Sequence, residues 1–172
     1  MLVLESPVMT TGMYERYIKL VGKKKVCVID CTFNPNEVRE KPGGRTLKTL
    51  LARIKQEAEE AVLRGVENIV LSDEFTEETK TAAPIILCVG AVQTHLVEQG
   101  LRSSCSILVR SAECLDTHYF AVLIGAGATA VNAYMAQDSL SDRVKRGLLD
   151  MSTDEAVAQY KKAIEGLSLI HI

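Results

Sequence analysis

Apolar residues recur at steps of three and four positions in two stretches of the chain, each followed by a glycine. The first stretch covers residues 46–65, and its apolar positions are Leu47, Leu50, Leu51, Ile54, Ala58, Ala61 and Val62. The second covers residues 85–99, with Ile85, Cys88, Val89, Val92 and Leu96. This spacing places the apolar side chains on one face of a helix, so both stretches are predicted to be amphipathic helices.

Three other stretches are rich in β-branched residues and predict strands, at residues 25–33 (KVCVIDCTF), 68–71 (NIVL) and 104–110. The first is almost continuously apolar, which predicts burial on both faces. A loop with Pro42, Gly43 and Gly44 follows it. Strands that alternate with helices are typical of a parallel sheet with right-handed crossovers. We therefore predict an α/β fold with a parallel sheet.

The two ends differ from this pattern. Residues 1–22 are predicted to be a linker segment, because Pro7 favours an extended chain. Ser152 and Glu155 have the spacing of a capping box, which predicts a helix that ends at Gly166. The apolar tail of residues 167–172 (LSLIHI) has no partner pattern, and we expect it to be non-native. The expected α/β domain therefore covers residues 23–166, and we interpret the chain as a fragment.

Composition excludes several classes of protein. A hydrophobic content of 47% with 24% charged residues indicates a globular domain rather than a disordered one. A net charge of −2 does not favour nucleic-acid binding, and no apolar run is long enough to cross a membrane. Five cysteines without paired spacing favour free thiols in the cytoplasm.

Three acidic residues follow the predicted strands and are candidates for a shared site. Asp30 and Asp73 stand at the carboxyl ends of the first two strands, and Glu113 follows the third. Ligands bind at this edge in many α/β proteins, so the three carboxylates are a possible strand-end rim. The alternative, which we favour, is that each one caps a turn or a helix N-terminus.

A glycine-rich segment at residues 125–130 (GAGATA) matches the G-x-G-x-x-A pattern of dinucleotide-binding loops. Gly125 and Gly127 would then let the backbone approach a pyrophosphate at a helix N-terminus. This function needs a strand at residues 119–124. We favour the alternative, in which small residues allow close packing, because the motif comes too late in the chain to be followed by the rest of a nucleotide-binding unit.

The remaining reactive side chains show no catalytic or metal-binding arrangement. Cys27 and Cys31 lie four residues apart, which is not metal-ligand spacing, and they are expected to be buried thiols. His95 and His118 have no nucleophile in a recognisable arrangement nearby, so they are expected to be packed or at the surface. We predict no catalytic residue and no metal site.

An ordered series of short motifs carries a resemblance to a known family. These motifs are API at residues 83–85, AV-x-x-HL at 91–96, GLR at 100–102, H-aromatic-FA-x-L-I-G at 118–125 and GA-x-AVN-x-Y-x-A at 127–136. Together they resemble the central domain of the glutamate synthase large subunit, over residues 4–166. The chain departs from the family at Glu74, where LSDR has arginine, and at Ala126, where tyrosine is usual.

The resemblance implies a domain related to part of a βα barrel, with a helix rather than a strand at residues 119–124. It also implies a place in a cytoplasmic oxidoreductase that makes glutamate from glutamine and 2-oxoglutarate. Adjacent glutaminase and flavin domains, FMN, an iron–sulfur cluster and a possible reductase subunit would belong to the full enzyme. The chain itself would be a non-catalytic connecting domain that helps to channel ammonia, and it would be inactive alone.

Two other functional classes stay open at this point. One is a stand-alone nucleotide-binding oxidoreductase built on residues 125–130, and the other is an interaction module without a ligand. The first requires the strand at residues 119–124 that the resemblance replaces with a helix.

Overall fold

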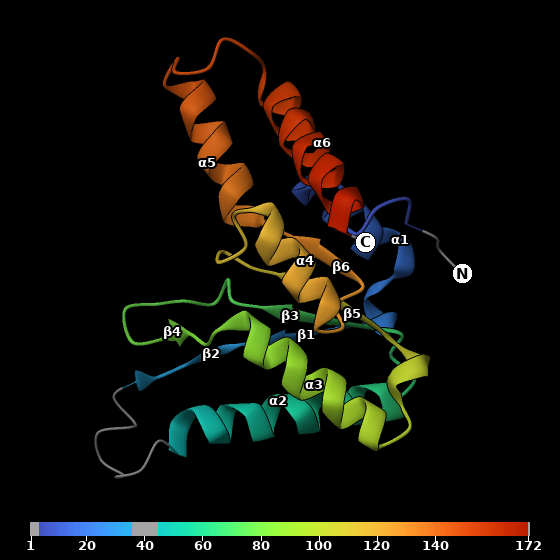
Figure 1. The fold of residues 1–172 in the computed structure, drawn as a ribbon. Helices are drawn as coiled ribbons and strands as arrows, with labels where there is room; N and C mark the ends of the chain where they lie inside the picture. The colour runs from blue at the N-terminus through green and yellow to red at the C-terminus, as the bar shows by residue number, and fades with distance from the viewer. Residues whose placement is uncertain (1–3, 36–44, 172) are drawn as a thin grey trace.

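The computed structural model describes residues 4–35 and 45–171 (Figure 1). The predicted loop at Pro42, Gly43 and Gly44, together with residues 1–3 and 172, lies outside them. The helices are α1 (Thr11–Val21), α2 (Arg45–Leu63), α3 (Ile85–Glu98), α4 (Thr117–Gly125), α5 (Tyr134–Lys145) and α6 (Thr153–His171), with 3-10 turns η1 (Lys23–Lys25) and η3 (Arg102–Ser104). The strands are β1 (Val26–Asp30), β2 (Thr32–Phe33), β3 (Asn68–Ser72), β4 (Thr81–Ala82), β5 (Ser106–Arg110) and β6 (Ala130–Asn132).

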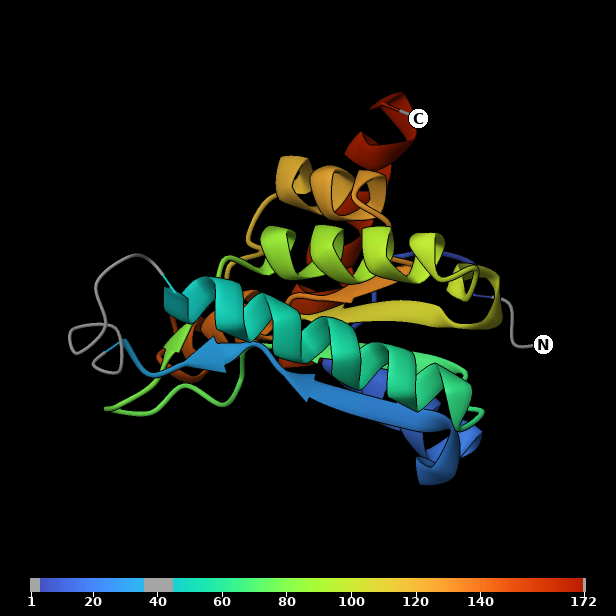
Figure 2. The same cartoon turned by 90° about the horizontal axis from the view of Figure 1, so that it is seen from below.

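Four of these strands form a parallel sheet in the order β1-β3-β5-β6. The register pairs Val28 with Val70, Val70 with Leu108, and Leu108 with Ala130. Each strand is followed by a helix that crosses to the next strand, and α2, α3 and α4 lie side by side in one layer (Figure 2). The α/β prediction is confirmed. Sequential strand order with the helices on one face is also how a segment of a βα barrel is built, which supports that predicted relation.

One face of the sheet packs against this helical layer and is called the three-helix face. Strand side chains on it include Ile69, Ile107 and Val131, all of them fully buried. They share one apolar core with Ile54 of α2, Val92 of α3 and Leu123 of α4. Ile164 of α6 belongs to the same core, so a single apolar cluster joins the sheet to four helices. Because these positions carry the helical repeats seen in the sequence, the apolar pattern explains this face of the fold.

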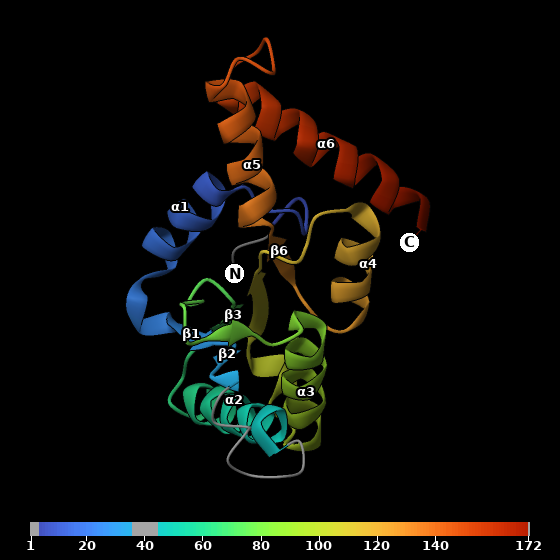
Figure 3. The ribbon, with the colours of Figure 1, turned by 90° about the vertical axis from the view of Figure 1, so that its left-hand side faces the viewer.

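The opposite face, called the α1 face, is covered more thinly (Figure 3). Met9, Val70, Leu108 and Ala130 form its small buried cluster, and partly buried side chains of α1 pack against them. Val28 of β1 lies beyond this cover and is 45% exposed. The prediction that the first strand is buried on both faces is therefore wrong, because β1 is an outer strand and α1 reaches only part of its second face.

Several element boundaries differ from the predictions. The predicted strand at residues 25–33 splits at Cys31, after which β2 pairs antiparallel with β4 in a separate small sheet. Strand β6 and helices α1 and α5 were not predicted. Gly166 does not end the last helix, since α6 continues to His171. The capping box is confirmed, because the Glu155 amide donates to Ser152 Oγ at 3.2 Å and the Ser152 amide donates to Glu155 Oε2 at 2.8 Å.

The segment predicted as a linker contributes to the sheet and to its cover. The Val131 amide donates to the Pro7 carbonyl at 2.8 Å, and the Met9 amide donates to the Val131 carbonyl at 2.9 Å. Residues 7–9 therefore lie along the outer side of β6, and α1 follows directly. The boundary between residues 22 and 23 stays a prediction.

Helices α5 and α6 contact each other and extend away from the sheet, and α6 also contacts α4 (Figure 1). Among the described residues, no helix is both long and apolar enough to span a bilayer.

Candidate functional site

The carboxyl ends of the parallel strands bring a group of polar side chains to one edge of the sheet. This strand-end cluster consists of Asp73, Glu74, Arg110, Ser111, Glu113, Asn132 and Tyr134. Asp73, Ser111 and Asn132 are almost fully buried. A parallel sheet produces this convergence, because strand ends far apart in the sequence meet at the same edge.

Asp73 is 1% exposed and accepts several hydrogen bonds from neutral donors. Ser111 Oγ donates to it at 2.6 Å, the Ala112 amide at 2.9 Å, and the Tyr134 hydroxyl at 3.0 Å. Burial, the Asp73 charge and the hydrogen bond to Asp73 together raise the pKa of Tyr134 far above its ordinary value. Tyr134 therefore stays protonated at neutral pH and acts as a donor rather than a base.

Glu113 joins the end of β5 to the start of α3. Its Oε2 accepts the Ile85 amide at 3.0 Å and the Tyr119 hydroxyl at 2.7 Å. Burial and the Glu113 carboxylate raise the pKa of Tyr119, so this hydroxyl also remains a donor. A carboxylate that accepts an amide in the first turn of a helix stabilises that helix end. This geometry supports the capping interpretation for Glu113.

The structure joins two of the three predicted rim residues. Ser111 Oγ donates to Asp73 and accepts the Glu113 amide at 3.1 Å, which places Asp73 and Glu113 in one network. Asp30 lies apart from this network and accepts the Thr32 amide at 2.8 Å and the Thr32 hydroxyl at 2.7 Å. Lys80 Nζ lies 4.0 Å from Asp30 Oδ2. A site that uses all three carboxylates stays a prediction.

Arg110 belongs to the strand-end cluster, but the sequence pattern did not predict it as a site residue. Its guanidinium lies between two aromatic rings, with Cζ 4.9 Å from the Tyr14 centroid and 5.1 Å from the Tyr134 centroid. It also donates to Asn132 Oδ1 at 2.8 Å and forms an ion pair with Glu74. Glu74, which replaces the arginine usual in the family, thus pairs with a cation from the next strand. Nothing in the sequence near Arg110 indicates this contact.

Gly125 and Gly127 occur in the reverse of the context that a dinucleotide loop needs. Gly125 is the last residue of α4, Gly127 follows this helix, and strand β6 comes after both. The helix predicted at residues 119–124 by the family resemblance is therefore confirmed. Gly127 has φ +115°, and a Cβ there would clash with the Gln93 side chain. Arg102 Nη2 donates to the Gly127 carbonyl at 2.9 Å. The positive φ therefore favours glycine at position 127, and the Gln93 side chain of α3 packs against it, which supports the packing interpretation.

The cysteines, His95 and His118 show no arrangement for metal binding. All five thiols are free, and the part of the chain that the structure describes contains no group of three His, Cys, Asp or Glu side chains able to hold a metal ion. Burial raises the pKa of Cys114 to about 12 and also raises the pKa of Cys27 and Cys105. Because no three of these side chains come together among the described residues, they do not form the cysteine ligand set of an iron–sulfur cluster. His95 Nε2 lies 2.6 Å from Glu59 Oε2, and His118 is exposed.

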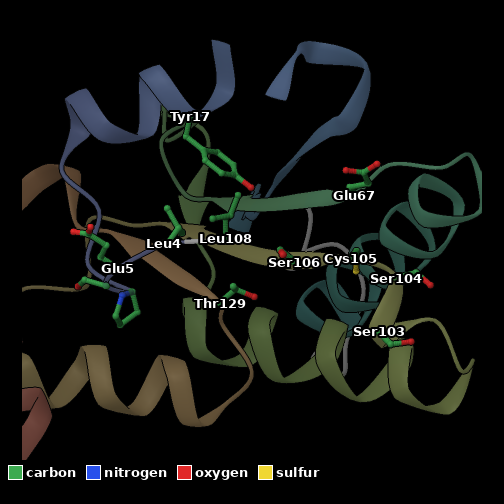
Figure 4. Close-up of a pocket in the computed structure, with 12 residues that line it drawn as sticks. Leu4, Glu5, Tyr17, Glu67, Ser103, Ser104, Cys105, Ser106, Leu108 and Thr129 are labelled. Atoms are coloured by element: carbon green, nitrogen blue, oxygen red, sulfur yellow. The ribbon is translucent and has the colours of Figure 1, made fainter. Parts of the chain in front are cut away.

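A cavity of about 640 Å³ opens at the opposite edge of the sheet, where the strands begin (Figure 4). Its wall combines Leu108 and Tyr17 with hydroxyls of Ser106 and Thr129. The Tyr17 hydroxyl donates to Asn68 Oδ1 at 2.6 Å, so it is already engaged. Every buried side-chain N or O atom of the described residues has a hydrogen-bond partner. The cavity therefore offers no unpaired buried group for ligand recognition.

Comparison with known sequences shows to which family this chain belongs. The sequence model of the glutamate synthase central domain matches residues 1–170. The chain belongs to the glutamate synthase central domain family. The NADPH glutamate synthase large chain of Azospirillum brasilense is 45% identical over 166 residues, which cover 96% of this chain and 11% of that protein.

Other relatives come from bacteria and plants. The NADPH glutamate synthase large chain of Bacillus subtilis is 43% identical over 108 residues, covering 63% of this chain and 7% of that protein. The chloroplastic ferredoxin-dependent glutamate synthase of Spinacia oleracea is 40% identical over 139 residues, covering 80% of this chain and 8% of that protein. The chain thus spans about a tenth of the length of these relatives and corresponds to their central domain.

Proposed function

We propose that this chain is the non-catalytic central domain of a glutamate synthase, where it connects and orders the domains that carry out the reaction. The observation that supports the proposal most directly is the occupation of the strand-end cluster by its own contacts. Asp73 and Glu113 accept hydrogen bonds from backbone amides and tyrosine hydroxyls, and Arg110 pairs with Glu74. These groups stabilise loop and helix ends, and none is left to act on a substrate.

The whole enzyme would make glutamate from glutamine and 2-oxoglutarate. In this proposal, adjacent glutaminase and flavin domains supply the chemistry, and FMN and the iron–sulfur cluster bind there. The central domain would form part of a wall that keeps released ammonia from bulk water. A continuous apolar core with fully buried helix contacts suits a rigid wall of this kind.

The first test uses the purified 172-residue chain. Titration with FMN, glutamine and 2-oxoglutarate, followed by calorimetry and flavin fluorescence, should show no saturable binding. Tight FMN binding by this chain alone would contradict the connecting role.

The second test uses a full-length glutamate synthase that contains this domain. Amide-labelled ¹⁵N-glutamine should transfer its label to glutamate without dilution by unlabelled ammonium in the medium. Strong dilution of the label would show that ammonia escapes, and it would contradict the wall while leaving family membership intact.

A further inference from the structure

The outer edge of β1 carries backbone groups that point away from the sheet. In a strand, the N–H and C=O groups of one residue point to the same side, and successive residues alternate sides. The Lys25 carbonyl accepts the Glu67 amide at 3.2 Å, and the Cys31 amide donates to the Ser72 carbonyl at 2.8 Å, so the odd-numbered residues face β3. The backbone groups of Val26, Val28 and Asp30 therefore face outward.

Two of these six outward groups are already used within the chain. The Val26 amide donates to the Lys23 carbonyl, which closes the turn η1. The Asp30 carbonyl accepts Arg53 Nη2 from α2 at 2.6 Å. Within residues 4–35 and 45–171, four groups then have no protein partner: the Val26 carbonyl, the Val28 amide, the Val28 carbonyl and the Asp30 amide.

We propose that β1 pairs antiparallel with β1 of a second copy of this chain, across a two-fold axis at Val28. In this register Val28 lies opposite Val28 of the second copy, and the two residues exchange both of their hydrogen bonds. Val26 lies opposite Asp30 of the second copy. The free Asp30 amide of each copy meets the free Val26 carbonyl of the other, while the two groups already used within each chain also lie opposite each other.

This self-complementarity favours a second copy over an unrelated strand. All four free groups gain a partner, and neither internal bond has to break. A two-residue shift would place the axis at Cys27 or Ile29 and Val28 opposite Val26 or Asp30 of the second copy. One of the two Val28 hydrogen bonds would then meet a group that is already bonded within the chain. The register centred on Val28 is thus the one that satisfies the edge.

Side chains at the edge fit the same arrangement. Val28 is 45% exposed on the α1 face, and the pairing buries it against its symmetry mate. Antiparallel pairing also brings the exposed Lys23–Lys25 of each copy towards Asp30 of the other. Helix α2 flanks the edge on the three-helix face. Arg53, which contacts the Asp30 carbonyl at this edge, forms an ion pair with Glu57, so its charge is balanced there.

Most of the edge lacks the features that normally prevent such pairing. Val26, Cys27, Val28 and Ile29 include no charged residue, no proline and no glycine, and Asp30 is the one charged residue of the strand. Natural edge strands usually carry charges, prolines or bulges that block a further strand. The opposite outer strand, β6, is covered by residues 7–9, whereas no strand of residues 4–35 and 45–171 pairs with the outer side of β1.

The test is sedimentation equilibrium of the 172-residue chain over a range of concentrations. The wild type should show a reversible monomer–dimer equilibrium. Val28→Lys and Val28→Glu should each be monomeric, because two like charges would meet at the axis, and an equimolar mixture of the two should recover dimers. Val28→Thr keeps the β-branched shape and the backbone groups, so it is the matched control and should still dimerise.

Circular dichroism and thermal unfolding of each variant show whether it is folded. Amide exchange adds an independent reading, since the Val28 and Asp30 amides should exchange more slowly as the concentration rises, while Cys27 and Ile29 should not change. A wild type that stays monomeric at every concentration would overturn the proposal. Dimers that survive in both charged variants, or folded variants whose mixture stays monomeric, would place the contact elsewhere and also overturn it.

Discussion

The two faces of the sheet are held by different forces. The three-helix face is apolar throughout, and its strand side chains interdigitate with four helices. The α1 face has a buried cluster of only four residues and is held largely by hydrogen bonds between distant segments. Asn132 Nδ2 and Gln137 Nε2 both donate to the Met9 carbonyl, at 3.1 and 3.3 Å, and Tyr17 donates to Asn68. Apolar packing therefore builds one face, and polar contacts attach the other.

A pair of adjacent core residues gives the largest expected effect on this comparison. Ile107 and Leu108 are neighbours in β5, point to opposite faces and are both at most 2% exposed. Ile107→Ala should lower the free energy of unfolding by about 4 kcal/mol, because the surrounding helices cannot collapse into the cavity. Leu108→Ala should cost about 2–3 kcal/mol, because Leu108 borders the cavity of Figure 4 and its surroundings can relax.

Urea unfolding of both variants, followed by circular dichroism, checks this difference. Equal losses would show that the two faces are packed equally well. A larger loss for Leu108→Ala would reverse the comparison.

The sequence predicted the three-helix face well because the apolar repeats of α2 and α3 are long and regular. It did not predict the α1 face, since contacts such as Asn132 with Met9 join residues 123 positions apart and leave no local pattern. Strand β6 was missed for a different reason. It has only three residues, and its position depends on β5 and on residues 7–9 rather than on its own sequence.

The sequence also predicted only part of the strand-end cluster. Strand ends converge in any parallel sheet, so Asp73 and Glu113 could be placed near each other from their positions after strands. Their donors could not, because Tyr134 reaches Asp73 from 61 positions away and depends on the placement of α5. Asp30 lies apart from this network, because its carboxylate accepts hydrogen bonds from the nearby Thr32. A site that also includes Asp30 stays a prediction.

The next largest loss of stability is expected at Asn132, whose hydrogen bond to the Met9 carbonyl joins β6 to the N-terminal segment on the α1 face. Asn132 is 1% exposed and binds both the Met9 carbonyl and Arg110. Asn132→Leu should lower the free energy of unfolding by about 2–3 kcal/mol, because it leaves buried polar partners unpaired. Its particular signature is local, since the amides of α1 should exchange faster than those of α3. Uniformly faster exchange would show instead that Asn132 supports the whole domain, and Ser139→Ala on exposed α5 is the matched control.

The smallest effect concerns the Tyr17 hydroxyl, which donates to Asn68 Oδ1 at 2.6 Å. Tyr17→Phe should cost about 1 kcal/mol at neutral pH, because one hydrogen bond is lost.

Burial, with a smaller contribution from the Glu67 charge, raises the pKa of Tyr17 above its ordinary value of 10.0. The unfolded chain therefore loses this proton first as the pH rises, and the stabilising contribution of the hydroxyl decreases from about pH 10 upward. The difference in stability between wild type and Tyr17→Phe should accordingly be constant at about pH 8 and shrink above about pH 10, as measured by urea unfolding at each pH. A difference that stays constant or grows would mean that the phenol is not held in its neutral form, and that the bond to Asn68 does not attach α1 to the sheet.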